Sequence, residues 1–225
     1  MKSKTFLILF FLVIVCGAVL IIKPKIFHQH SKEFITVNKE VKNDQEINVK
    51  SFTDMPDKEI TLLEAFNLCL KIARKYDKKP KLIYLGSVDD KKLSGGDGKK
   101  GNWQGVLALP KVNHHMVIVI ESGKLKNYRF IDSSDEYFIP ISYLKTDSSQ
   151  IIVKAKKQFN LQPSPKDDPF SHGFHYRIFN DGKHIFFAVD GQINGQAAEI
   201  YFSPQNGQYI GRTEHSLRYG RSKLY

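Results

Sequence analysis

Two pairs of histidines are the first residues in this sequence that could do chemistry. His172 and His175 form an H-x-x-H pattern where a loop meets a predicted strand, so both rings could turn to one side. His114 and His115 are neighbours on another predicted strand, where adjacent side chains point to opposite faces. Neither pair is accompanied by cysteines or by an HExxH helix, the usual setting of a zinc site. We therefore expect no metal and no cofactor.

Other catalytic patterns are incomplete. The segment "SGGDGKKG" (residues 94–101) lacks the Ser or Thr of a P-loop and leads into a strand, so we interpret it as a hairpin loop. No G-x-S-x-G pattern is present, and Cys69 falls on the apolar stripe of a predicted helix. The sequence thus predicts a protein that is not an enzyme, without catalytic residues. One catalytic hypothesis stays open, a hydrolase site assembled from His172, His175 and the loop acids Asp89, Asp90, Asp167 and Asp168.

The C-terminal segment offers a binding site instead. The chain has a net charge of +11, and in "GRTEHSLRYGRSKLY" cations alternate with Tyr219 and Tyr225. Aromatic rings among cations can hold anionic polymers or lipid headgroups, although a solvated tail is the simpler interpretation. The candidate residues for binding an anionic partner are Arg212, Arg218, Arg221 and Lys223.

The N-terminal segment predicts the location. Residues 6–22 are uncharged and follow Lys2 and Lys4. Seventeen helical residues span roughly 25 Å, and flanking lysines can extend that reach across a bilayer. No small-residue cleavage site follows, and Val15 precedes Cys16 where a lipoprotein signal needs a small residue. We predict an uncleaved transmembrane signal-anchor over residues 1–25, crossing the cell membrane once, with the remainder extracytoplasmic.

The rest of the chain predicts a stalk and two similar halves. Residues 26–58 are polar and typical of a solvated stalk. A capping box at Thr61 and Glu64 begins an apolar helical stripe, and alternating strands follow. Asp147 and Gln150 begin a second helix, again followed by strands and by an Asn206-Gly207 turn.

We therefore predict an α+β fold of two repeated units behind the transmembrane helix. Each unit is one helix packed on a sheet of three or four antiparallel strands. The first unit covers residues 59–145, and the second covers residues 146–225 with the basic tail.

Two segments carry a family resemblance. "EITLLEAFNLCLKIA" resembles the opening helix of PepSY domains, and "AEIYFSPQNGQYIGR" resembles their closing hairpin. Gly207 and Ile210 stand where that family has its glycine and following aliphatic residue, whereas Ser203 replaces a common acidic residue. The resemblance implies an extracytoplasmic helix-on-sheet module that regulates or inhibits peptidases, with no catalytic residues.

The sequence favours one function and leaves another open. The first hypothesis is a non-enzymatic, membrane-anchored protein that binds or regulates another envelope protein, a peptidase included. The alternative is a binding module for an anionic cell-wall polymer, lipid headgroups or another ligand, for which the basic charge is suited. We do not expect nucleic acid as a partner outside the cell.

Overall fold

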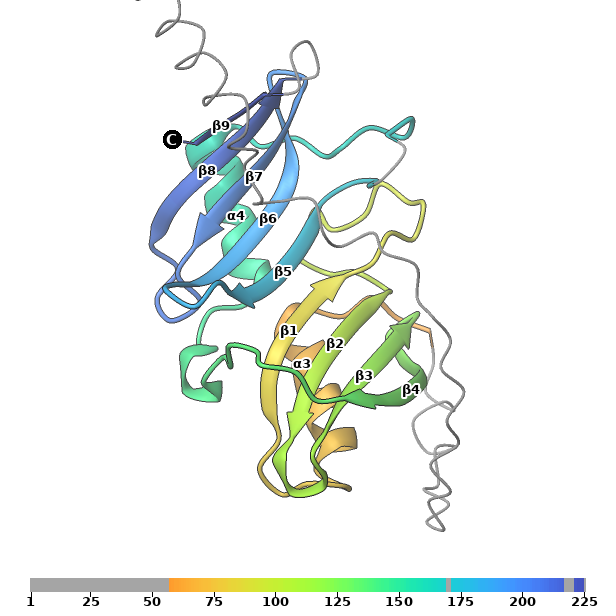
Figure 1. Cartoon of the computed structure of the whole chain (residues 1–225). Coiled ribbons are helices and arrows are strands. Elements are labelled where there is room, and N and C mark those ends of the chain that lie inside the picture. The colour runs from red at the N-terminus through yellow and green to blue at the C-terminus, as the bar shows by residue number, and fades with distance from the viewer. Residues whose placement is uncertain (1–56, 169–170, 217–220, 225) are drawn as a thin grey trace, which may run out of the picture. The chain divides into compact units, whose positions relative to one another are not determined.

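The computed structural model describes residues 57–168, 171–216 and 221–224, all within one compact unit that spans Ile47–Tyr225. This part of the chain forms two α-helices and nine strands (Figure 1). In chain order these elements are α3 (Leu62–Ala73), β1 (Lys81–Ser87), β2 (Trp103–Leu109), β3 (His114–Glu121), β4 (Lys124–Asp132), α4 (Ser148–Phe159), β5 (His175–Asn180), β6 (Ile185–Ile193), β7 (Gln196–Phe202), β8 (Tyr209–Ser216) and β9 (Arg221–Leu224). Short 3-10 turns lie at Pro110–Val112 and Ile141–Tyr143.

All nine strands belong to a single antiparallel sheet, in the order β4-β3-β2-β1-β5-β6-β7-β8-β9. The predicted fold of two repeated helix-on-sheet units is therefore wrong. β1 and β5 pair edge to edge through Leu85 with Ile178 and Gly86 with Arg177. A strand edge presents unpaired N–H and C=O groups, so joining two edges satisfies both.

The helices are also tied together at their N-termini. The Ser148 hydroxyl at the start of α4 accepts the backbone N–H of Leu62 in α3 at 2.9 Å, and the Asp147 carboxylate accepts that of Leu63 at 3.1 Å. Asp147 and Ser148 thus cap the first turns of both helices, whose N–H groups have no partner within their own helix. This shared cap is a second reason why the halves do not form separate units.

Local sequence signals were read correctly. Both predicted capping boxes are confirmed, Thr61 with Glu64 and Asp147 with Gln150. Gly207 has φ +66°. The predicted turn needs a positive φ at this position, and a residue without a Cβ adopts it readily. The segment beyond β8 was expected to be a solvated tail, but residues 221–224 pair with β8 as the edge strand β9.

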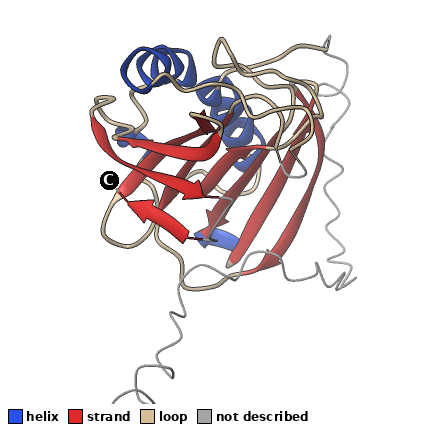
Figure 2. Ribbon diagram, turned by 90° about the horizontal axis from the view of Figure 1, so that it is seen from above, coloured by secondary structure: helices blue, strands red, loops and turns tan. Residues whose placement is uncertain are grey.

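The core lies between the sheet and the two helices, which cover the same sheet face (Figure 2). It is continuous across the joint between β1 and β5. Trp103 on β2 and Tyr176 on β5 stack with ring centroids 6.4 Å apart and are fully buried. Cys69 lies on the buried stripe of α3, and burial raises the pKa of its thiol to about 12, so it is an apolar core residue.

The described residues include no helix long and apolar enough to cross a membrane. The predicted anchor over residues 1–25 and all but the last two residues of the predicted stalk lie outside the described residues. Both stay predictions.

Candidate functional site

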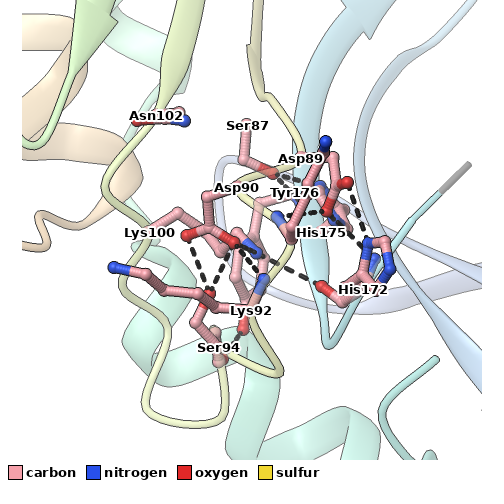
Figure 3. A network of polar contacts seen from close by, with 12 residues as sticks. Ser87, Asp89, Asp90, Lys92, Ser94, Lys100, Asn102, His172, His175 and Tyr176 are labelled. Carbon is pink, nitrogen blue, oxygen red and sulfur yellow. Dashed lines mark hydrogen bonds and ion pairs between the residues drawn. The ribbon is translucent and has the colours of Figure 1, made fainter. Parts of the chain in front are cut away.

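The joint between β1 and β5 gathers a group of polar side chains, which we term the seam network: Ser87, Asp89, Asp90, Lys100, His172 and His175 (Figure 3). The first four come from the end of β1 and the hairpin loop before β2, His172 from the segment before β5, and His175 from the first position of β5. Antiparallel pairing of β1 and β5 places these two ends side by side, although they are more than 80 residues apart in sequence.

A buried ion pair lies at the centre of this network. The Lys100 ammonium lies 3.3 Å from Asp90 Oδ1 and donates to the backbone carbonyl of His172. The Lys100 side chain is fully buried and that of Asp90 is 8% exposed. Burial lowers the pKa of Lys100, and the negative charge of Asp90 opposes that effect. The pair holds the hairpin loop against the segment before β5.

The histidines complete the seam network. His172 Nδ1 lies 2.8 Å from Asp89 Oδ2, and its Nε2 lies 2.9 Å from the carbonyl of Lys166. The ring of His172 therefore connects the hairpin loop that carries Asp89 to the segment at Lys166. Burial raises the pKa of Asp89, but hydrogen bonds from His172 and from the backbone N–H of Lys91 outweigh it and leave that pKa lowered.

Ser87, His175 and Asp89 resemble a catalytic triad in composition but not in geometry. His175 Nδ1 lies 3.1 Å from Ser87 Oγ, which already accepts the backbone N–H of Tyr176. His175 Nε2 lies 3.8 Å from Asp89 Oδ1, beyond hydrogen-bond distance. His175 is 7% exposed, so a substrate has little access to its ring. The arrangement therefore suits a structural joint better than a nucleophile.

The residues of the open hydrolase hypothesis are thus partly brought together. Asp89, Asp90, His172 and His175 meet in the seam network, whereas Asp168 caps a nearby turn by accepting the N–H of Ser171. Among the described residues no group of three or more His, Cys, Asp or Glu side chains is placed to hold a metal ion. His115 is buried and His114 bonds the carbonyl of Val112.

A second site lies at the opposite end of β1. A cavity of about 460 Å³, which we term the lysine pocket, lies where the turn after α3 meets the turn between β2 and β3. Its lining residues are Asp77, Lys78, Lys79, Lys81, Pro110 and Lys111. All four lysines are exposed, and the ion pairs formed within the described residues involve other cations.

Asp77 fixes the two turns that carry these lysines. Its Oδ1 accepts the backbone N–H of Lys79 at 2.8 Å, and its Oδ2 accepts that of Lys111 at 2.7 Å. Burial of Asp77 raises its pKa, but these two hydrogen bonds and the positive charge of Lys111 outweigh that effect and lower the pKa. One buried carboxylate therefore ties together the two turns whose lysines line the cavity.

An exposed aromatic segment adjoins the lysine pocket. The Lys81 ammonium lies 4.5 Å from the ring centroid of Phe138, in the connection between β4 and α4. Phe138 is 38% exposed and its neighbour Tyr137 is 60% exposed. The Phe138 carbonyl accepts a hydrogen bond from Asn180 at the end of β5, which fixes this segment beside the sheet.

The predicted anionic-partner residues at the C-terminus lie elsewhere. Arg212 on β8 forms an ion pair with Glu214 at 2.9 Å and lies over the ring of Phe159. Arg221 and Lys223 belong to the edge strand β9, opposite Ser216 and Glu214. Arg218 lies outside the described residues. Nothing in this arrangement tests whether these residues bind an anion.

Sequence reasoning did not single out the lysine pocket. The run "DKKPK" (residues 77–81) is visible in the sequence, but a run of lysines beside a proline does not by itself indicate a binding site. Lys111 lies 30 residues further on in an unremarked turn, so its approach to this run is a tertiary contact.

Comparisons with known proteins add little. No protein-family model matches the chain, and no curated protein matches it. One solved structure, of a protein provisionally named a lipoprotein from Clostridium difficile 630, is 13% identical with a TM-score of 0.46, over 76% of this chain and 96% of that one. A similarity at this level carries no conclusion about either fold or function. The PepSY resemblance likewise stays a prediction.

Proposed function

We propose that this chain is a non-enzymatic binding protein that holds an anionic polymer of the cell envelope in the lysine pocket. The observation that carries the proposal is the convergence of four exposed lysines on one cavity around a buried carboxylate. Residues 1–25 would anchor the chain in the membrane and keep the pocket on the outer side, within reach of such polymers.

Charge and geometry both support this function. Clustered exposed cations that form no ion pair among the described residues create a positive potential that attracts polyanions, and lysine binds phosphate as a point charge. A cavity of this volume lies within the range of small-ligand sites, so one or a few repeat units of a polymer fit it. Asp77 preorganises both turns, which reduces the entropy lost on binding.

The test is binding of polyphosphate of defined length to the full chain in neutral detergent. Replacing Lys78, Lys79, Lys81 and Lys111 by glutamine should weaken binding by roughly tenfold or more and flatten its salt dependence. A matched control neutralises four exposed lysines away from the pocket: Lys99, Lys157, Lys166 and Lys183. A third variant neutralises the C-terminal candidates Arg212, Arg218, Arg221 and Lys223.

The three variants separate the competing functions. Equal losses in the pocket and control variants would mean that only net charge matters. A larger loss in the C-terminal variant would move the site to β8 and β9. If wild-type protein binds no polyanion at physiological salt, the proposal fails, and the function of binding another envelope protein would be tested by cross-linking in intact cells.

A further inference from the structure

We infer that the ligand of the lysine pocket is a hydroxyl-bearing anion, a phosphodiester-linked polyol or sugar, rather than a bare polyanion. This inference rests on the proposed function and specifies its ligand. Two features of the site do not contribute to binding a bare polyanion. They are Asp77, an acidic residue of the cavity wall, and the exposed ring of Phe138, over which the ammonium of Lys81 lies, with exposed Tyr137 next to it in sequence.

A carboxylate in the wall selects against simple anions. Each oxygen of Asp77 accepts one backbone N–H, from Lys79 or from Lys111. A carboxylate offers about four acceptor positions, so two remain after these bonds. A phosphate group gains nothing from a negative neighbour, whereas a ligand hydroxyl can donate to it. Lysines for the phosphate and an acceptor for the hydroxyl together match a polyol phosphate.

The aromatic segment supplies the third contact. Aromatic faces carry negative potential and attract weakly positive C–H groups as well as cations. Lys81 already lies over Phe138, so an anion bound at Lys81 brings its carbon-bearing neighbours to these rings. Tyr137 packs over the turn at Gly182, where an added Cβ would lie 2.5 Å from its ring, and this contact fixes the platform.

The experiment compares two oligomers that differ only in the hydroxyl, with the full chain in neutral detergent. The probes are an oligo(glycerol phosphate) and an oligo(1,3-propanediol phosphate) of the same length, with polyphosphate as the carbon-free reference. The glycerol oligomer should bind about tenfold tighter than the propanediol oligomer, because a hydrogen bond to a carboxylate is added.

Replacing Tyr137 and Phe138 together by leucine should weaken the binding of both oligomers by about threefold and leave the binding of polyphosphate unchanged. Val153→Ser, at an exposed position on α4, is the control.

Each outcome has one meaning. Equal affinity for both oligomers, with both lost in the lysine-pocket variant, would overturn the hydroxyl inference and leave the proposed function standing. If the lysine-pocket variant bound all three probes as tightly as wild type, both the hydroxyl inference and the proposed function would be overturned. Tighter binding to vesicles of anionic lipid than to the glycerol oligomer, abolished by the leucine variant, would replace the polyol by a membrane surface.

Discussion

The two ends of β1 carry the same residue types in opposite settings. At one end, Lys100 and Asp90 are buried as a pair within the seam network. At the other, Asp77 is buried and its hydrogen bonds go to backbone N–H groups, while the lysines around it are exposed and form no ion pair among the described residues. Charged groups of the seam network pair with one another within the fold, whereas the exposed ammonium groups of the lysine pocket can bind a ligand. The seam network should therefore control stability, and the pocket should control binding.

The largest effect is expected at the buried ion pair. Asp90→Asn removes the carboxylate that forms the ion pair with the buried ammonium of Lys100, which should cost about 3–5 kcal/mol of unfolding free energy in urea denaturation. Asp135→Asn, at an exposed position, makes the same change of charge and should cost almost nothing. The double variant Lys100→Met with Asp90→Leu should recover much of the loss. If Asp90→Asn matched its control, the seam network would not be a stabilising joint.

The next effect concerns the contact between the hairpin loop and α4. Gly98 has φ +88°, and an added Cβ would lie 2.3 Å from the backbone nitrogen of Ser149. Gly195 has φ +75° with nothing within 4 Å of an added Cβ. Gly195→Ala should therefore cost only the left-handed strain of about 1–2 kcal/mol, and Gly98→Ala should cost clearly more. Equal melting temperatures of the two variants would contradict the tight contact.

Asp77→Asn tests the carboxylate of the lysine pocket. An amide keeps one acceptor, so one buried backbone N–H loses its partner, at a cost of about 1–3 kcal/mol. Asp181→Asn is the matched control, because there a single oxygen, Oδ1, accepts the N–H groups of both Lys183 and His184. We expect Asp77→Asn to be destabilising in thermal unfolding and Asp181→Asn to be close to neutral. The reverse order would mean that Asp77 does not hold the two turns.

Acidification should weaken the seam network moderately. Burial lowers the pKa of His175, and the charge of Lys100 lowers it further, so the unfolded chain takes up this proton first. The stability contributed by neutral His175 is fully present above about pH 6.5, the pKa of this group in the unfolded chain. It is lost as pH falls through the pKa of His175 in the folded protein, by no more than about 1.4 kcal/mol per pH unit. Denaturation at a series of pH values should show this slope in wild type and a smaller one in His175→Gln.

Asp190 on β6 gives the opposite dependence of stability on pH, so its effect has to be measured separately from that of His175. Burial and the facing carboxylate of Glu199 raise the pKa of Asp190 to about 7, against the attraction of Arg177. The stability contributed by protonated Asp190 is fully present below about pH 4, the pKa of this group in the unfolded chain. It is lost as pH rises through the pKa of Asp190 in the folded protein. Asp190→Asn should therefore gain stability relative to wild type at pH 8, but not at pH 4. An equal effect at both values would show that Asp190 does not titrate in this range.

The smallest stability effect is expected in the lysine pocket. Glutamine at Lys78, Lys79, Lys81 and Lys111 removes exposed charges that form no ion pair among the described residues, so the melting temperature should change by little more than that of the control variant. A large loss of stability would place these lysines with the seam network, as part of the fold.

The sequence by itself determined the elements. Capping boxes identified the starts of α3 and α4, and the alternation of apolar residues identified β1 to β8, because helix ends and strand faces depend on neighbours in the chain. Gly207 and Cys69 were placed correctly for the same reason.

Only the tertiary structure decided how these elements join. Periodicity shows which face of a strand is apolar but not which edge will pair with which, so the pairing of β1 with β5 escaped prediction. That pairing collects Asp89, Asp90, Lys100 and the two histidines. The acids and histidines had suggested a hydrolase site, whereas the buried pair of Lys100 with Asp90 acts as a joint. The lysine pocket depends in the same way on one long-range hydrogen bond, from Lys111 to Asp77, which no local pattern records.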